Sequence, residues 1–211
     1  MAKIAASERD AFYEARRTEL AEVALALWAE KGFDGTSVAA IAEAAGISKG
    51  SFYLYFASKQ ALLEDVLRRY SLLPNIQSLA ETMVERPFED AVHSFVREAW
   101  RHLSEHRDLV LLAVRELPSH LKQAQDALER IVIPGNKLIA AYLEQQLGPE
   151  RAGEISLIVA GRGLIGTIVI MFLSQVVLGG SRFLPLGDEE ITSTIAQVFL
   201  HGVVGTKEST A

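Results

Sequence analysis

The stretch from Thr36 to Leu63, TSVAAIAEAAGISKGSFYLYFASKQALL, decides the fold that we expect for this chain. It predicts two short helices joined by a tight turn. Apolar side chains recur at helical spacing along the first helix, and Gly46 can adopt the left-handed conformation that ends a helix. Ser48 is a preferred N-cap residue for the second helix. The pattern is that of a helix-turn-helix, whose second helix enters the major groove of DNA in DNA-binding proteins.

The second helix carries the side chains that favour DNA. Phe52 and Phe56 are four residues apart and turn inward, so the remaining side chains face outward. A lysine supplies charge to phosphate or to a base edge, hydroxyl groups donate to phosphate oxygens, and a glycine lets the DNA backbone come close. Backbone N–H groups at the starts of the flanking helices add phosphate sites. The predicted DNA-binding residues are Thr36, Ser37, Lys49, Gly50, Ser51, Tyr53, Tyr55 and Lys59.

The same region resembles the DNA-binding domain of the TetR family of bacterial transcriptional regulators, from about Arg16 to Leu67. The residues at matching spacings are Trp28, Glu30, Lys31, Gly32, Phe33, Thr36, Ser37, Val38, Ile41, Ala42, Ala45, Gly46, Ile47, Ser48, Tyr53, Tyr55, Phe56, Ser58, Lys59, Leu62 and Leu63. The resemblance implies a regulator whose last two long helices form a homodimer and whose middle helices enclose a small-molecule pocket. The sequence departs from the family at Trp28, where phenylalanine is more usual, and at Ala39, where some members carry a base-contacting polar residue.

Composition narrows the possible classes of protein. The chain has 211 residues, 49% of them hydrophobic, which is ample for a buried core. It contains no cysteine, so disulfides, thiolate metal sites and cysteine nucleophiles are excluded. The first ten residues, MAKIAASERD, lack an apolar run of signal-peptide length, so we expect a cytoplasmic protein.

The charge of the chain needs explanation in a DNA-binding protein. The net charge is −6, whereas a DNA-binding surface is expected to be basic. No acidic residue lies between Glu43 and Glu64, however. The predicted DNA-binding stretch therefore presents its lysines without opposing carboxylates.

We expect an all-α chain, because almost every segment has helical periodicity and none shows the alternation of a strand. A three-helix DNA-binding domain with the helix-turn-helix should cover residues 1–57, and a linking helix should cover residues 58–73. A helical ligand-binding and dimerisation domain should cover residues 74–204, followed by a flexible tail over residues 205–211.

Two prolines bear on the helix limits. Pro74 is expected to end the linking helix, because proline removes a backbone donor and clashes with the preceding turn. Pro134 either kinks one helix or separates two helices.

The apolar segment over residues 155–178 allows three interpretations. The run GRGLIG, residues 161–166, matches the glycine pattern of a dinucleotide-binding turn, but the alternating strands and helices of that fold are missing, so we expect no cofactor. The uncharged run 163–180 reaches the minimum length of a membrane span, but arginines flank it closely and there is no second span. We favour a helix buried between the chain's own core and a partner subunit, without membrane contact.

The last helix, from about Asp188 to Val204, is amphipathic, and with the preceding helix it should form half of a four-helix dimer interface. A homodimer in turn predicts a palindromic operator in double-stranded DNA. The predicted interface residues are Ile168, Phe172, Ile191, Ile195, Val198 and Gly202.

Polar and aromatic side chains within the apolar helices of the C-terminal domain, with one valine beside them, are candidates for holding a small-molecule effector. They are His93, Val96, Trp100, Arg115, Tyr142, Arg162 and Gln175. His102 and His106 stand four residues apart, as zinc ligands can, but their charged neighbours indicate a solvated face, and we expect no metal.

Two classes of function remain. The sequence contains no nucleophile elbow, phosphate-binding loop, HExxH motif or paired carboxylates, so we expect no enzyme and no catalytic residues. The favoured hypothesis is a repressor released from DNA by a small apolar or amphipathic ligand. The alternative is a small-molecule carrier or scaffold with a vestigial helix-turn-helix. Sequence-specific, salt-sensitive DNA binding discriminates between the two.

Overall fold

The computed structural model describes residues 6–82, 86–116 and 121–204, and all regular secondary structure in these ranges is helical, which confirms the predicted class. Contacts within the chain divide it into two compact units. The head unit comprises the chain up to Tyr70 together with Leu111–Ala127, and the body unit comprises Ser71–Val110 and the chain from Leu128 onward. The domain limits drawn from the sequence stay predictions, and the tail over 205–211 lies outside the described residues.

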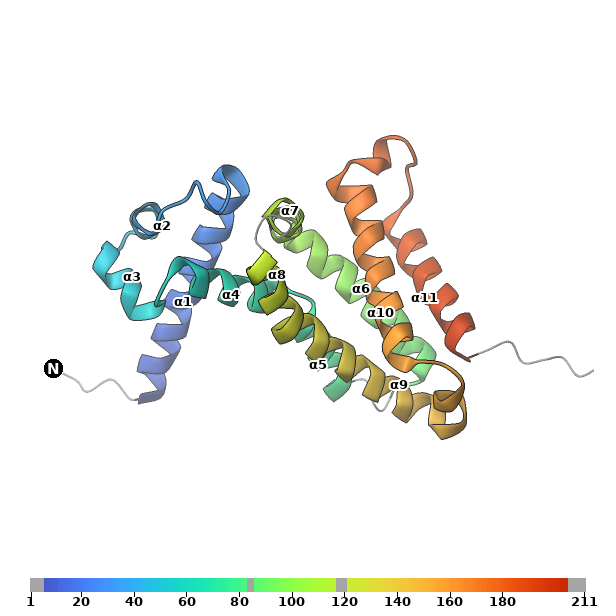
Figure 1. Cartoon of the computed structure of the whole chain (residues 1–211). Coiled ribbons are helices and arrows are strands. Elements are labelled where there is room, and N and C mark those ends of the chain that lie inside the picture. The colour runs from blue at the N-terminus through green and yellow to red at the C-terminus, as the bar shows by residue number, and fades with distance from the viewer. Residues whose placement is uncertain (1–5, 83–85, 117–120, 205–211) are drawn as a thin grey trace, which may run out of the picture. The chain divides into compact units, whose positions relative to one another are not determined.

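The head unit is built on a long first helix. Its elements are α1 (Ala6–Lys31), α2 (Val38–Ala44), α3 (Lys49–Tyr55), α4 (Lys59–Tyr70), the end of α7 (Arg107–Glu116) and α8 (Leu121–Ala127) (Figure 1). Helix α1 packs against α2, α3 and α4, and α4 also packs against α8. The large side chains at the centre have almost no exposed surface; they are Leu20, Trp28, Phe33, Ile41, Phe52, Leu62 and Val66.

Serine N-caps and a left-handed glycine set the limits of the helices, and the sequence predicts this at Ser48 and Gly46. The hydroxyl oxygens of Ser37, Ser48 and Ser58 each accept a hydrogen bond from the backbone N–H three residues later, at 3.0 to 3.1 Å. Gly46 has a φ of 68°, which turns the chain sharply between α2 and α3.

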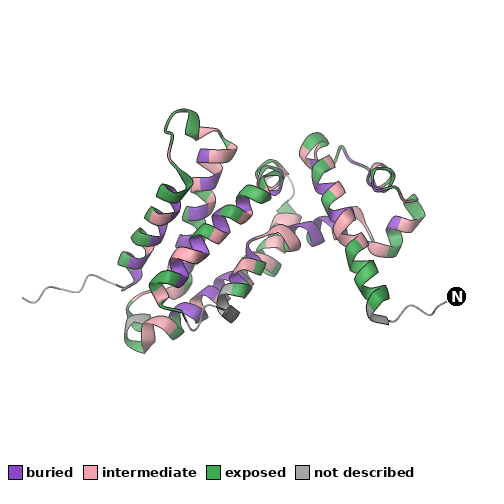
Figure 2. Cartoon of the chain, turned by 180° about the vertical axis from the view of Figure 1, so that it is seen from behind, coloured by how far each residue is buried: buried purple, intermediate pink, exposed green. Residues whose placement is uncertain are grey.

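The body unit is a bundle of longer helices. Its elements are α5 (Leu73–Thr82), α6 (Phe88–Glu105), the start of α7, the π-helical turn η2 (Leu128–Val132), α9 (Ile133–Glu154), α10 (Leu157–Phe172), the π-helical turn η3 (Leu173–Val177), the 3₁₀ turn η4 (Gly180–Arg182) and α11 (Asp188–Val204). Helix α6 contacts α11, α10 and α5, while α9 contacts α10 and α5. Buried positions lie along the inner faces of these helices, and exposed positions lie on the outer faces (Figure 2).

The structure places both prolines near the starts of helices, which differs from the prediction for Pro74. Helix α4 ends at Tyr70, and Pro74 lies in the first turn of α5 rather than ending the linking helix. Proline is tolerated there because the first N–H groups of a helix have no partner within it. Pro134 lies near the start of α9, directly after η2, and Val132 keeps helical dihedral angles. The backbone therefore stays helical through this proline, and a π-helical turn precedes it.

Candidate nucleic-acid interface

Two phenylalanines hold the inner face of α3 against the rest of the head unit. Phe52 has no exposed surface and Phe56 has 3%, and their ring centroids lie 6.0 Å apart. The turn before α3 is closed by backbone hydrogen bonds from Gly46 to Glu43 and from Ile47 to Ala42, at 3.0 and 2.9 Å. The remaining face of α3 is thereby fixed outward.

The outer face of α3 carries most of the side chains predicted to meet DNA. Lys49 and Gly50 are exposed, and Tyr53 is 50% exposed. Ser51 is half-buried, and its hydroxyl lies 2.8 Å from the hydroxyl of Ser48. Tyr55 is also half-buried because its ring packs on the ring of Tyr13, with centroids 5.1 Å apart. This face therefore offers one cation, several hydroxyl groups and no carboxylate.

Two of the predicted DNA-binding side chains are built into the protein instead. Thr36 is 1% exposed, and its hydroxyl donates to the carbonyl of Gly32 at 2.8 Å. The ammonium group of Lys59 donates to the carbonyls of Phe33 and Thr36, at 2.8 and 3.0 Å, and lies 4.3 Å from the centre of the Phe33 ring. Lys59 therefore ties the loop after α1 to the start of α4, and the geometry gives it a structural role. Ser37 remains exposed.

A buried carboxylate that the sequence analysis did not select joins α4 to α1. Asp65 is 5% exposed and accepts hydrogen bonds from Arg17 at 2.7 Å, from Arg68 at 2.8 Å, and from Arg69. Burial acts to raise the pKa of Asp65, but the hydrogen bonds from Arg69 and Arg68 and the positive charges of Arg69 and Arg17 outweigh it, so the pKa lies below its ordinary value.

Arg17 extends this network to the end of α3. Its guanidinium lies 4.7 Å from the centre of the ring of Phe56, the residue that follows α3. The available sequence signal was an aspartate between buried apolar positions of α4, with arginines three and four residues later. Arg17 is 48 residues away in the chain, so helical spacing could not reveal the pairing.

Comparison with known proteins agrees with this geometry. Residues 20–66, which contain the helix-turn-helix, match the family model of bacterial regulatory proteins of the tetR family. The repressor KstR2 of Rhodococcus jostii is 47% identical over 55 residues, which cover 26% of this chain and 27% of the relative. The regulator YerO of Bacillus subtilis is 26% identical over 191 residues, which cover 86% of this chain and 62% of YerO. The chain belongs to the TetR family.

The TetR family likeness extends over both units at the level of the fold. The crystal structure of FadR from Bacillus subtilis, in complex with stearoyl-CoA, superposes with a TM-score of 0.70 at 19% identity. The match covers 88% of this chain and 98% of the FadR chain. The match spans less than two thirds of the length of these curated relatives, 62% of YerO and 27% of KstR2. The relatives are regulators, in agreement with the expectation that this TetR-family chain is not an enzyme.

The residues predicted for an effector pocket fall into two groups. Val96, Trp100, Tyr142 and Gln175 are buried in the body unit, and His93 is half-buried there. The prediction is wrong for Arg115, which lies in the head unit and donates to the backbone carbonyls of Trp28 and Ala29 at 2.6 and 3.3 Å. These bonds satisfy carbonyls near the end of α1. Arg162 is exposed on α10 and stays outside the core.

The predicted dimer interface also divides. Ile168 and Phe172 have no exposed surface, and Phe172 packs edge-on against Trp100 with ring centroids 5.3 Å apart. These two side chains belong to the chain's own core and cannot meet a partner without unpacking it, so this part of the prediction is corrected. Ile191 and Ile195 are largely buried as well. Val198, at 68% exposed, and the exposed Gly202 remain on the surface.

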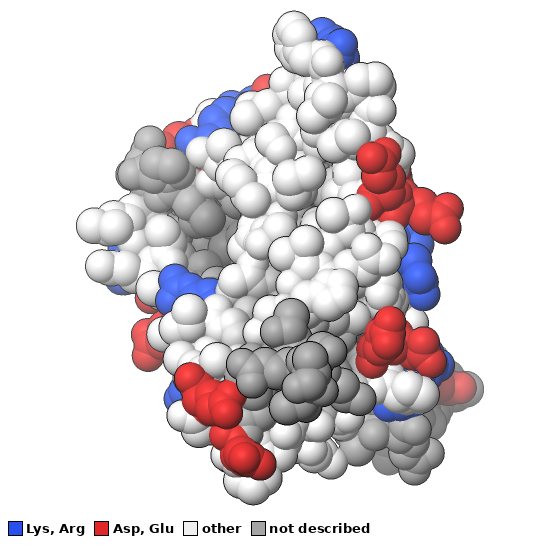
Figure 3. All heavy atoms as spheres, turned by 90° about the vertical axis from the view of Figure 1, so that its right-hand side faces the viewer, with Lys and Arg blue, Asp and Glu red and all other residues white. Residues whose placement is uncertain are grey.

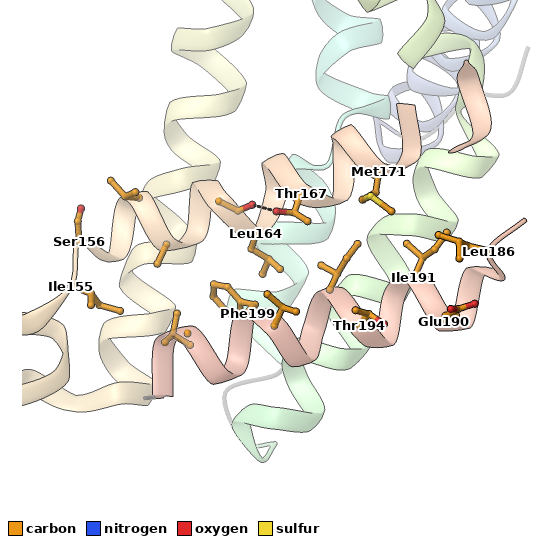
Figure 4. A pocket seen from close by; sticks show the side chains of 17 residues that line it. Ile155, Ser156, Leu164, Thr167, Met171, Leu186, Glu190, Ile191, Thr194 and Phe199 are labelled. Atoms are coloured by element: carbon orange, nitrogen blue, oxygen red, sulfur yellow. Dashed lines mark hydrogen bonds between the residues drawn. The ribbon is translucent and has the colours of Figure 1, made fainter. Parts of the chain in front are cut away.

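An apolar groove lies between α10 and α11, which run side by side (Figure 1). Its volume is about 750 Å³, and side chains from both helices line it (Figure 4). Val159 on α10 and Val198 on α11 lie on its rim, and they are 67% and 68% exposed. Seen from this side of the molecule, uncharged residues fill the centre of the face, with acidic and basic groups toward the margins (Figure 3).

Proposed function

We propose that this TetR-family chain is a transcriptional repressor that binds a palindromic DNA operator as a homodimer and is released by an uncharged, mainly apolar effector. The observation that carries the DNA-binding part is the outer face of α3. It is exposed, free of carboxylates, equipped with Lys49 and the hydroxyls of Ser51 and Tyr53, and held by a buried inner face. Packing within the head unit alone does not account for the composition of this exposed face.

Lys49 should supply phosphate attraction, since it is exposed on α3 and no acidic residue is near it in the sequence. Changing Lys49 to Ala should weaken binding to the specific operator and to non-specific DNA by similar factors. It should also reduce the slope of log affinity against log salt by about one per subunit. Fluorescence anisotropy with labelled duplexes, at several salt concentrations, measures both quantities.

Lys59 is the matched control for Lys49, because its ammonium already bonds two carbonyls of the protein. Lys59→Ala should lower the melting temperature and leave the salt slope unchanged at temperatures where the variant is folded. A Lys49→Ala variant with wild-type affinity and slope would remove Lys49 from the interface.

A second copy of the chain is the occupant that we propose for the groove between α10 and α11. The segment Leu157–Val177 is long and apolar enough to cross a membrane, but its inner side chains, such as Leu164 and Ile168, pack in the body core. An exposed apolar face on one side of a packed bundle is typical of a subunit interface. One recognition helix per chain reads few base pairs, so dimerisation also provides the second half-site.

The body unit suggests the chemical class of the effector. The indole N–H of Trp100, the hydroxyl of Tyr142 and the amide oxygen of Gln175 are buried without a hydrogen-bond partner. Such groups are costly to bury unpaired, so a bound molecule that pairs with them gains affinity. Burial raises the pKa of Tyr142, so its hydroxyl stays protonated and able to donate.

The same core argues against a charged effector group. The buried polar residues of the described body unit are Asn136, Gln175 and Thr192, and none of them carries a charge. A buried anion without a cationic partner would be strongly disfavoured. FadR is solved with stearoyl-CoA; a ligand of that kind would fit here only with its apolar chain in the core and its charged part outside. We therefore expect an uncharged molecule with at least one acceptor and one donor.

Trp100→Phe tests this site, because phenylalanine keeps an aromatic ring against Phe172 but removes the unpaired N–H. A library of uncharged lipophilic compounds is titrated against the DNA complex, and the affinity of the best binder is measured with and without operator. A compound that lowers the affinity for operator must, by thermodynamic reciprocity, itself bind less tightly when operator is present. Trp100→Phe should lower the affinity for the compound roughly threefold to tenfold and leave the affinity for operator unchanged. Equal affinity for the compound with and without operator would reject release from DNA by an effector and would favour the carrier hypothesis.

Selection of bound sequences from random duplex DNA tests the proposed function as a whole. The full chain should enrich one palindromic motif, whose two halves are separated by about one helical turn or a multiple of it. If several rounds of selection recover only unrelated sequences, the chain binds DNA without sequence specificity. That result would count against a repressor.

A further inference from the structure

Leu54 is an apolar side chain that the packing of the head unit does not explain. It is 71% exposed, more than any other large apolar side chain in the described part of that unit. Its neighbours on the opposite face of α3, Phe52 and Phe56, are 0% and 3% exposed. Leu54 therefore lies at the centre of the outward face, directly opposite the side that holds the helix in place.

The surroundings of Leu54 leave its side chain uncovered by the rest of α3. Helical side chains lean toward the preceding turn, so Leu54 lies over Gly50 and Ser51, four and three residues earlier. A Cβ atom at Gly50 would meet nothing closer than the Ser48 hydroxyl, at 3.7 Å. The position is thus open, and the missing side chain leaves room for a close approach by DNA. The backbone at Leu54 is held in place, because its carbonyl accepts a hydrogen bond from the Tyr13 hydroxyl at 2.9 Å.

We propose that Leu54 contacts the C5 methyl group of a thymine in the major groove, and that this contact fixes one T·A base pair in each half-site of the operator. A leucine side chain cannot hydrogen-bond to a base edge. Thymine alone among the four bases presents an apolar group at the major-groove edge, so it is the base that a leucine can distinguish. The inference rests on the proposed function and adds a residue that specifies sequence.

Deoxyuridine provides the direct test, because it lacks only the thymine methyl group and keeps the same base pairing. Each thymine of the selected operator is replaced by deoxyuridine in turn, symmetrically in both halves, and affinities are measured by anisotropy at one salt concentration. Replacement at one thymine position of the half-site should lower the affinity. Burying a methyl group is worth roughly fourfold in affinity, so loss of two contacts should cost about fifteenfold.

The Leu54→Ala variant completes a double-mutant cycle between the side chain and the methyl group. It should bind the thymine and deoxyuridine operators equally, at about the affinity of the wild-type protein for the deoxyuridine operator. Leu121→Ala is the matched control, because Leu121 is a leucine of the same unit that is 69% exposed on α8. That variant should keep both the wild-type affinity and the full deoxyuridine penalty.

The outcomes separate this inference from the proposed function. An enriched operator that shows no deoxyuridine penalty at any position, or a penalty that persists in full in Leu54→Ala, would overturn the methyl contact while leaving the repressor intact. If no operator is enriched at all, the proposed function fails, and the role of Leu54 fails with it.

Discussion

Replacing Asp65 with alanine should destabilise the head unit by about 2–4 kcal/mol. The carboxylate is 5% exposed and accepts hydrogen bonds from three arginines. Its removal leaves Arg17 and Arg69, whose side chains are 24% and 19% exposed, without their buried acceptor. The loss is smaller than for a fully buried pair, because the arginines keep some contact with water and Arg69 retains Glu14 at 2.8 Å.

The two tryptophans of the chain allow the head unit to be measured by itself. Trp28 is completely buried in the head unit and Trp100 lies in the body unit. In a Trp100→Phe background, fluorescence during urea unfolding reports on the head. Glu19→Ala is the control: it removes the acid of an exposed ion pair, Arg16 to Glu19 at 2.6 Å, and should cost less than about 1 kcal/mol. If Asp65→Ala cost no more than this control, the network would not stabilise the unit.

The pH dependence of this contribution has a definite sign. Because the pKa of Asp65 in the folded protein lies below its ordinary value of 3.8, the folded state favours the ionised carboxylate. The stabilisation is fully present above the pKa of the unfolded chain and is lost as the pH falls through the lower pKa of the folded state. The difference in stability between wild type and Asp65→Asn should therefore shrink under acid conditions.

Val198→Glu should convert the protein to monomers and weaken operator binding by at least about a hundredfold, since each monomer reads only one half-site. Val198 is 68% exposed on the rim of the apolar groove between α10 and α11. A carboxylate there would be buried without a partner when two copies meet, which is strongly unfavourable. Sedimentation velocity gives the oligomeric state, and anisotropy gives the affinity.

The neighbouring position provides the control for this substitution. Gln197 is exposed on the same helix and is not part of the groove lining, so Gln197→Glu adds the same charge outside the proposed interface. That variant should remain a dimer with normal operator affinity. A soluble Val198→Glu dimer that binds operator normally would show that the chains associate through another surface.

Local patterns predicted the head unit well, because its helices are short and their signals are close together in the sequence. Ser48 caps α3 and Gly46 makes the left-handed turn, both as expected, and Ser37 and Ser58 cap the helices on either side. Distant partners were beyond these signals. Lys59 bonds the carbonyl of Phe33, 26 residues earlier, and Arg115 bonds the carbonyl of Trp28, 87 residues earlier.

The body unit shows a different limit of sequence patterns. Helix α10 is apolar on nearly all sides, so periodicity could not tell which face meets the chain's own core and which meets a partner. The core takes Leu164, Ile168 and Phe172, and the exposed face carries Val159 and Ile170. The sequence therefore predicted an interface helix but assigned two core residues to its outer surface.

The most direct test of the central claim is the ratio of affinities for the selected operator and for a scrambled duplex of equal length and composition. It is measured with the full chain at one physiological salt concentration. A sequence-specific regulator should bind the operator at least about a thousandfold more tightly, with two chains per duplex. A ratio near one, with binding to both duplexes lost as salt rises, would show only charge-driven association and would contradict the account.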